Sequence, residues 1–240
     1  LIHAVIAANP RTVVVLISGS AILTETWRDR VPALLLAWYG GMEGGRALAS
    51  VLTGSEDPGG RLPFVLPTDV AHLPFFDSAA KSVVYDDQWG QRRLDAMGHT
   101  PAFPFGFGLG YTTIEHRLLH HTFDNTGGHA DVLVTNTGDR KGSTVVQIYA
   151  ADVSLRRPVA QLLGFRKVTL QPGAETSVRI GLDAGPTLQR DPTTRCWSSR
   201  AGEWALLASQ HSPVSWENAV HVRRTKGLID EAGTSAGQQA

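Results

Sequence analysis

The sequence is poor in cysteine and in long apolar runs. Cys196 is its single cysteine among 240 residues, so no disulfide can form within the chain, and no Cys/His spacing predicts a structural zinc. The longest apolar runs, residues 12–17 and 31–39, are too short to cross a bilayer and have the length of buried strands. We therefore expect neither a metal site nor a membrane-spanning segment.

An excess of charge of either sign is also missing. Lys and Arg number 22, as do Asp and Glu, which gives a formal net charge of zero at pH 7. No long-range field would draw such a chain to nucleic acid or to an anionic membrane. The balance favours a neutral small substrate or a protein surface as the binding partner.

What is present is enough apolar material for folded domains. Hydrophobic residues make up 42% of the chain and charged residues 18%, a composition that argues against general disorder. A length of 240 residues favours two domains. The first residue is Leu1, and residues 1–8 have the pattern of a helix end and not of a signal peptide, so we expect further residues upstream. The sequence does not identify a cellular compartment.

The first third of the chain alternates helix-like and strand-like segments. Its strand-like runs lack polar alternation, as is typical of parallel strands covered on both faces. Pro and Gly mark the ends of predicted helices: Asn9-Pro10 ends the first helix of this region, and Gly54 ends the last helix. We predict helices over residues 1–8, 21–28 and 43–52, strands over 12–17 and 33–37, and a short strand or edge segment over 61–66.

The remainder of the chain has a different character. Residues 68–104 lose periodicity and predict a long loop of the kind that is functional or covers a neighbouring domain. After Tyr111, short alternating strands recur about every ten residues without helices between them, which predicts an antiparallel sandwich. The clearest strands cover residues 130–135, 143–150, 164–170, 176–182 and 202–208. Residues 225–240 are rich in Gly, Ser, Gln and Ala and predict a flexible tail.

One glycine cluster occupies a position where ligands often bind. Residues 40–45 read Gly-Gly-Met-Glu-Gly-Gly, between the end of a predicted parallel strand and the start of a helix. These glycines either let a ligand approach the backbone or only permit a tight turn, and spacing alone favours the turn. The Walker pattern is absent, so no phosphate site is predicted. Trp38, Tyr39 and Glu43 are our candidates for side chains near a substrate.

Two other motifs fail the structural context that their chemistry needs. Residues 106–110, Gly-Phe-Gly-Leu-Gly, are neither preceded by a strand nor followed by a helix, so they predict an aromatic turn between domains and not a dinucleotide loop. Residues 18–20, Ser-Gly-Ser, lack the spacing of a nucleophile elbow and predict a strand-ending turn. We expect no cofactor, and a serine hydrolase is disfavoured.

Histidines and aspartates are explained without catalysis. Four histidines near the middle of the chain lack a complementary Cys or carboxylate spacing, and we interpret them as solvated: His116, His120, His121 and His129. Asp57, Asp86 and Asp87 fit turns.

Several aromatic side chains fall in predicted loops. They either stack on sugar rings or pack between domains, and the sequence leaves both alternatives open. They are Trp38, Tyr39, Phe75, Phe76, Tyr85 and Trp89.

Six segments in a fixed order resemble glycoside hydrolase family 3 over nearly the whole chain. Each is weak alone, and their order is what makes the resemblance strong. The segments are residues 9–19 (NPRTVVVLISG), 37–45 (AWYGGMEGG), 57–63 (DPGGRLP), 103–112 (FPFGFGLGYT), 134–139 (VTNTGD) and 157–168 (RPVAQLLGFRKV).

The resemblance implies an N-terminal TIM barrel with an Asp nucleophile, an αβ sandwich domain that contributes a Glu acid/base, and a fibronectin type III-like domain. In the family both catalytic motifs precede the stretch matched by residues 1–9, so the resemblance implies that this chain contains neither. Glu43 matches the Gly-x-Glu-Gly-Gly segment, which is not the acid/base position. Residues 85–98 follow the family's Tyr/Glu/Gly-Tyr-Arg pattern only loosely.

We therefore expect a fold of class α/β followed by all-β: part of a parallel αβ sandwich over residues 1–110 and a fibronectin type III-like sandwich over 111–224. The expected function is that of a C-terminal fragment of a β-glucosidase-like enzyme, inactive alone, which acts on β-linked oligosaccharides or aryl or alkyl glycosides with a missing barrel. The alternative is a non-catalytic carbohydrate-binding or assembly module that works with a separate barrel chain. The αβ part of this chain has an open sheet edge and an uncovered apolar face. Unless an upstream segment or a partner covers it, we expect this part to be marginally stable or prone to association.

Overall fold

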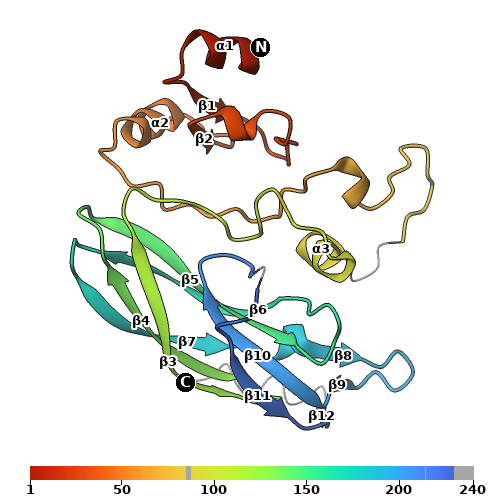
Figure 1. Cartoon of the computed structure of the whole chain (residues 1–240). Coiled ribbons are helices and arrows are strands. Elements are labelled where there is room, and N and C mark those ends of the chain that lie inside the picture. Colours follow the sequence, from red (N-terminus) through yellow and green to blue (C-terminus); the bar gives the residue numbers. More distant parts are fainter. Residues whose placement is uncertain (85–87, 214, 230–240) are drawn as a thin grey trace.

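A computed structural model describes residues 1–84, 88–213 and 215–229 (Figure 1). The chain forms a small αβ unit at its N-terminal end and a larger β-sandwich, with irregular segments between them. None of the helices in these three ranges is long and apolar enough to traverse a bilayer. The elements of the αβ unit are α1 (Ile2–Ala8), β1 (Val13–Leu16), η1 (Arg28–Arg30), β2 (Ala33–Leu36) and α2 (Gly44–Leu52).

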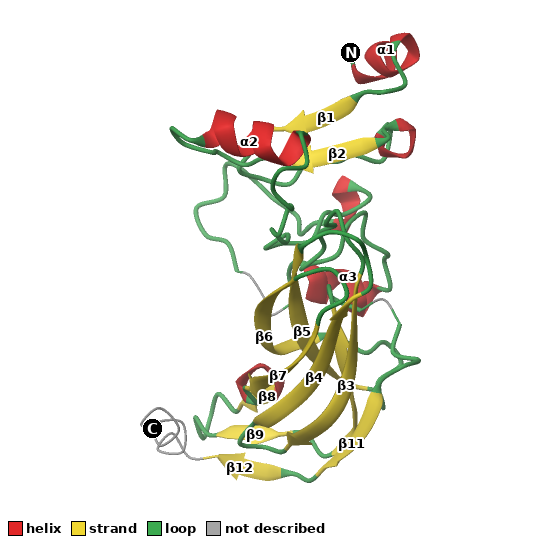
Figure 2. Ribbon diagram, turned by 90° about the vertical axis from the view of Figure 1, so that its left-hand side faces the viewer, coloured by secondary structure: helices red, strands yellow, loops and turns green. Residues whose placement is uncertain are grey.

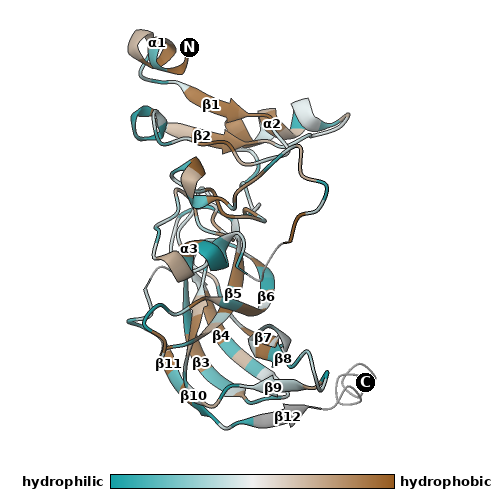
Figure 3. Cartoon of the chain, turned by 90° about the vertical axis from the view of Figure 1, so that its right-hand side faces the viewer, coloured by the Kyte–Doolittle hydropathy of each residue, from teal (hydrophilic) through white to brown (hydrophobic). Residues whose placement is uncertain are grey.

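The two strands of the αβ unit pair in parallel, with Val13 opposite Ala33 and Leu16 opposite Leu36. Helix α2 lies beside this pair (Figure 2), and β1 is coloured hydrophobic in Figure 3. Neither α1 nor α2 has a buried residue. A parallel pair of apolar strands is normally covered on both faces, so this unit has the exposed apolar surface that the sequence predicts.

One prediction for this unit is wrong. Residues 21–28 form no α-helix: the backbone nitrogens of Trp27 and Arg28 both donate to Thr24 O, which makes a turn that leads into η1. Only a few residues separate this turn from Pro32, which leaves no room for a stable helix. For residues 61–66 the prediction of a short strand or edge segment holds in its second form: Leu66 bridges Phe103, and Leu62 exchanges backbone hydrogen bonds with Gly106 and Phe107. Pro63 and Pro67 limit the pairing there.

The connection between the two parts contains one helix that the sequence pattern did not predict. It includes η2 (Val70–His72) and α3 (Gln91–Met97). Helix α3 ends at Gly98, whose φ of 72° is the left-handed conformation that glycine adopts readily after a helix. Two features of the sequence indicate this helix: the glycine at its end, and Gln91 and Asp95, which are four residues apart and therefore lie on one face of a helix. The expected turn at Asp86 and Asp87 lies outside the described residues, as does Tyr85.

Two antiparallel sheets form the sandwich, as predicted. One has the strand order β3-β4-β7 and the other β11-β10-β5-β6. Their strands are β3 (Ile114–Phe123), β4 (Gly128–Asn136), β5 (Gly142–Asp152), β6 (Gln161–Leu170), β7 (Glu175–Leu182), β10 (Gly202–Ser209) and β11 (Val220–Arg224). A third, small sheet with the order β12-β9-β8 consists of β8 (Leu188–Arg190), β9 (Trp197–Ser199) and β12 (Gly227–Ile229), with η3 (Gly185–Thr187) before it.

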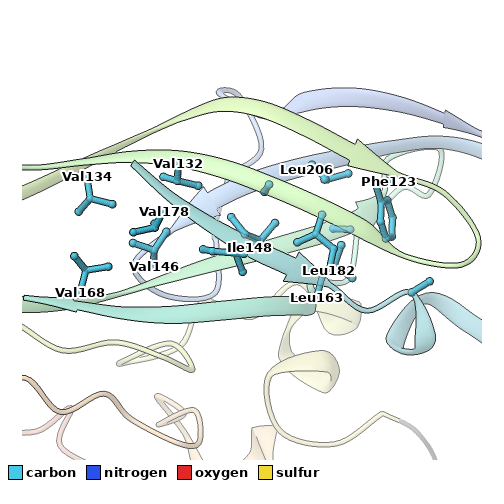
Figure 4. Close-up of a cluster of buried hydrophobic side chains, with 14 of the residues drawn as sticks. Phe123, Val132, Val134, Val146, Ile148, Leu163, Val168, Val178, Leu182 and Leu206 are labelled. Atoms are coloured by element: carbon cyan, nitrogen blue, oxygen red, sulfur yellow. The ribbon is translucent and has the colours of Figure 1, made fainter. Parts of the chain in front are cut away.

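The main hydrophobic core lies between the two larger sheets (Figure 4). Along β4, buried residues alternate with half-buried ones, so one face of the strand points inward. Val132, Val134, Ile148 and Leu206 are fully buried. Strand β12 lies within the segment expected to be a tail from residue 225, and residues 230–240 of that segment lie outside the described residues.

A set of polar contacts fastens the αβ unit to the connecting segment and to the sandwich. Asp57, expected to shape a turn, accepts hydrogen bonds from Tyr111 N at 2.7 Å and from Ser143 N at 2.9 Å. Arg28 Nη1 donates to Ala102 O at 2.6 Å, and its guanidinium lies over the Phe103 ring. These contacts join residues far apart in the sequence, so the irregular segments at this junction have a defined structure.

Candidate functional site

The candidate site lies at the carboxyl end of the two parallel strands. Residues 18–20 follow β1 and residues 37–43 follow β2, so both loops emerge at the same edge of the sheet. The loops touch: a Cβ added to Gly19 would lie 2.7 Å from Cε2 of Tyr39. Ser18, Gly19 and Ser20 thus form the strand-ending turn that the sequence predicts, and the Tyr39 ring rests against it.

Trp38 adopts an unusual backbone conformation at this edge. Its φ is 54°, a left-handed value that a bulky residue rarely takes and that costs roughly 1–3 kcal/mol. The half-buried indole makes an edge-to-face contact with Phe64, with 5.4 Å between ring centroids. That contact holds the strained residue in place. Strain of this kind occurs often at functional sites, which makes the Trp38 loop the strongest local indication of function in the αβ unit.

The side chains after Trp38 point into solvent. Tyr39 is 77% exposed and Met42 is fully exposed. Glu43 precedes α2 without making a side-chain cap, and its carboxylate lies 3.6 Å from Arg46 Nε. The edge therefore carries an exposed phenol, an exposed thioether and an exposed carboxylate. The phenol can stack on a sugar ring, and the carboxylate can accept hydrogen bonds from hydroxyl groups.

This edge does not present a pair of acids. In residues 18–20 and 37–46, Glu43 is the sole carboxylate. A retaining glycosidase needs two carboxyl groups about 5 Å apart. Glu43 alone, highly exposed and paired with Arg46, has the surroundings of a surface residue.

A cavity of about 830 Å³ lies on the inner side of the αβ unit. Its walls come from β1, β2 and the segments that run between the αβ unit and the sandwich. Apolar side chains dominate these walls, among them Leu16, Leu34, Leu36, Leu62 and Phe107. Trp38 also reaches this cavity, so the strained residue links the apolar interior to the exposed edge.

The histidine interpretation holds only in part. His116 is half-buried, burial lowers the pKa of its imidazole, and its Nε2 lies 3.1 Å from Ala208 O. The expectation that all four histidines are solvated is therefore wrong for His116. Among residues 1–84, 88–213 and 215–229, no three His, Cys, Asp or Glu side chains gather as metal ligands would.

The turn at residues 106–110 packs the two parts of the chain together, as predicted. A Cβ on Gly108 would lie 2.5 Å from Gly60 O, and one on Gly110 would lie 2.8 Å from Asp57 Oδ1. Phe107 contacts His211, with ring centroids 5.9 Å apart. The glycines are needed for close backbone approach, and the aromatic ring fills the junction.

Comparison with known proteins gives the same two parts. Residues 1–111 match the model of the glycosyl hydrolase family 3 C-terminal domain, and residues 144–212 match that of the fibronectin type III-like domain. The β-glucosidase BoGH3A of Bacteroides ovatus is 35% identical over 230 residues, which is 89% of this chain and 31% of the relative. Thermostable β-glucosidase B of Acetivibrio thermocellus is 36% identical over 237 residues, 94% of this chain and 31% of the relative.

Solved structures agree with the sequence comparisons. The β-glucosidase of Kluyveromyces marxianus superposes with a TM-score of 0.84 at 33% identity, over 95% of this chain and 28% of that one. β-Glucosidase 3B of Thermotoga neapolitana, solved with glucose, gives a TM-score of 0.80 at 30% identity, over 90% of this chain and 32% of that one. The chain thus spans about a third of the length of these relatives, and the predicted fold class is confirmed.

Proposed function

This chain belongs to glycoside hydrolase family 3, and from that membership we propose that it is the C-terminal part of an enzyme that hydrolyses β-glycosidic bonds. Its substrates are β-linked oligosaccharides or aryl or alkyl glycosides. The relatives that support this proposal are named β-glucosidases, and the chain covers about a third of each.

In this proposal the catalytic carboxylates come from a TIM barrel and from the upstream part of the αβ domain, and this chain supplies none. Its role is to complete the substrate pocket. The observation that carries the proposal is the carboxyl edge of β1 and β2, where strained Trp38 is followed by the exposed side chains of Tyr39 and Glu43. Tyr39 would stack on the sugar, and Glu43 would accept hydrogen bonds from its hydroxyl groups.

The apolar surface of the αβ unit also supports an incomplete pocket. Helices α1 and α2 have no buried residue, and Ile17 is 68% exposed next to the candidate edge. Burying such a surface against the missing barrel would stabilise the complex by roughly 25 cal/mol per Å². A barrel on the same polypeptide and a barrel on a separate chain would both fit this surface.

The first test is the purified chain alone with aryl β-glucosides and aryl β-xylosides. We expect no hydrolysis above that of the buffer, because a single exposed carboxylate cannot perform both steps of the reaction. Turnover by this chain, abolished by Glu43→Gln, would show that the catalytic groups are here and would refute the proposal.

The second test is a chimera in which this chain replaces the corresponding C-terminal third of BoGH3A. We expect the chimera to hydrolyse aryl β-glucosides and Tyr39→Ala to lower its kcat/KM by roughly 3- to 10-fold, the loss of one aromatic contact. Phe165→Ala is the matched control, since Phe165 is a 65% exposed aromatic residue on β6 of the sandwich. Equal effects of the two substitutions would remove Tyr39 from the site. Adding this chain to the truncated relative as a separate protein tests assembly in trans.

A further inference from the structure

A second cavity lies away from the αβ edge, in the segment between η2 and α3. Residues 73–84 of this segment swing out from the body of the molecule (Figure 1). The cavity measures about 410 Å³, which falls within the roughly 300–1,000 Å³ typical of small-ligand pockets. It is lined by Pro74, Phe75, Asp77, Ala80, Ser82, Val83, Val84, Gln88, Trp89 and Arg93.

Two aromatic side chains form the apolar part of this cavity. Phe75 is 88% exposed and Trp89 is 63% exposed, so both rings give their faces to solvent instead of to a core. They come from opposite ends of the segment, fourteen positions apart in the sequence. Two exposed aromatic rings that line one cavity can hold a flat, partly apolar ligand by stacking.

Polar groups accompany these rings. Arg93 donates through Nε to His72 O at 3.1 Å, and Asp77 accepts through Oδ1 from Ala79 N at 2.9 Å. Each contact fixes the direction of a side chain that lines the cavity. One cation and one anion balance each other, so the cavity does not select a phosphate or another strongly charged ligand. Together they suit a neutral ligand that is rich in hydroxyl groups.

The base of the cavity is firmly attached to the sandwich. Arg93 belongs to α3, whose neighbouring residue Arg92 hydrogen bonds to Gln161 on β6. Asp95 on the same helix accepts from Gln91 Nε2 at 2.8 Å and from Ala160 N at 3.1 Å. The cavity is therefore held by the sandwich side of the molecule, independently of the loops around Tyr39.

We propose that this cavity is a second, non-catalytic binding site for neutral saccharides. It takes β-linked disaccharides or longer oligosaccharides, with Phe75 and Trp89 stacking on sugar rings and Asp77 and Arg93 bonding hydroxyl groups. The choice of β-linked ligands rests on the proposed function, whereas the neutral, stacked mode of binding follows from the cavity itself. The site would hold a glycan substrate near the enzyme while the reaction takes place elsewhere.

The test is titration of the full chain with cellobiose, cellotriose and laminaribiose. Binding is measured by calorimetry and by tryptophan fluorescence. We expect saturable binding that Trp89→Ala and Phe75→Ala each weaken by roughly 3- to 10-fold, the loss of one stacking contact. Arg93→Gln, which keeps the helix and removes the charge, should weaken binding as well. Phe165→Ala is the matched control and should leave the affinity unchanged. Tyr39→Ala is measured beside it to detect any binding at the αβ edge. Circular dichroism checks that each variant is folded.

Three outcomes would overturn this proposal. The first is no saturable binding up to the solubility limit of the sugars. The second is binding that Tyr39→Ala abolishes and Trp89→Ala does not, which would place the sugar at the αβ edge. The third is self-association that Phe75→Ala removes, which would make the segment an interface between copies. Hydrolysis by the BoGH3A chimera is measured separately, so the proposed function stands or falls without this result.

Discussion

The carboxylate of Asp57 lies 2.9 Å from the backbone nitrogen of Ser143, a residue 86 positions later in the chain. The other oxygen of the same carboxylate accepts a hydrogen bond from Tyr111 N at 2.7 Å. Ser143 is on β5 of the sandwich, whereas Asp57 follows α2 of the αβ unit. One side chain thus satisfies two backbone donors from the other part of the molecule and sets the position of the αβ unit on the sandwich.

Replacing Asp57 with Ala is expected to destabilise the chain by about 1–3 kcal/mol, because two backbone N–H groups lose an ionised acceptor. Asp57→Asn should cost less, since the amide retains one acceptor oxygen and points a donor at the second N–H group. Urea unfolding of the three proteins gives the values.

Asp69→Ala is the matched control for Asp57. Asp69 is an exposed aspartate that accepts only from Ala71 N, two residues away, so its loss should cost less than about 1 kcal/mol. Similar losses of stability for Asp57→Ala and Asp69→Ala would show that Asp57 forms a local turn and no bridge between the parts.

The glycine turn at the junction makes a second prediction. Gly106 has φ +81°, and a Cβ there would overlap the Gln147 side chain, which is 97% buried and donates to Gln210 O at 2.6 Å. Gly173 has a similar φ of +69°, but open space where its Cβ would be. Gly173→Ala should lower the free energy of unfolding by about 1–2 kcal/mol, because alanine disfavours the left-handed backbone. Gly106→Ala should lower it by about 1–3 kcal/mol more, because its Cβ would also overpack against Gln147. Thermal unfolding compares the two variants. Equal costs would mean that Gln147 moves aside freely.

The sandwich was predictable because its strands bury one face. In β4 and β7 apolar and polar residues alternate regularly, and this two-residue period correctly predicts a strand. Strand β3 was missed because its pattern is interrupted. It contains three histidines, and its register shifts between Leu118 and His120, which breaks the alternation. The short strands β8 and β9 have three residues each, too few for any periodic signal.

The candidate site was predictable in position but not in conformation. Gly40 and Gly41 at the end of an apolar run predict the carboxyl edge of a parallel sheet, and Trp38, Tyr39 and Glu43 are the candidate residues at this edge. No local signal predicted the left-handed backbone of Trp38, since that conformation depends on Phe64, 26 positions later. Likewise, the cavity beside Trp89 depends on how α3 attaches to β6, which is a tertiary contact.

The exposed apolar surface of the αβ unit makes a third prediction. Ile17 is 68% exposed and Val13 is 47% exposed, and both lie on or next to β1. We expect the chain alone to bind 1-anilinonaphthalene-8-sulfonate under native conditions and to associate as its concentration rises. Ile17→Ser should reduce the dye fluorescence more than Phe165→Ser, because Phe165 is exposed on the sandwich and lies outside the apolar surface of the αβ unit. A monomeric chain without dye binding and with two sharp melting transitions would contradict this prediction.

The half-buried carboxyl group of Asp95 makes the last prediction, which concerns pH. Burial raises the pKa of Asp95 above its ordinary value of 3.8, and hydrogen bonds from Gln91 and Ala160 only partly oppose this. A raised folded-state pKa means that the folded protein binds the proton more tightly than the unfolded chain does. The resulting stabilisation is complete below the unfolded-state pKa and is lost as pH rises through the folded-state pKa.

Asp95→Asn removes this titration, so the stability of the wild type relative to this variant should fall as pH rises from 3.8 through the raised pKa of Asp95. Urea unfolding of both proteins at a series of pH values measures the difference. Asp131→Asn is the control of opposite sign. The hydrogen bonds from Arg179 lower the pKa of Asp131, so its contribution is present above the unfolded-state pKa and is lost as pH falls through the lowered one. Parallel pH profiles for the two variants would show that Asp95 is not desolvated in the folded protein.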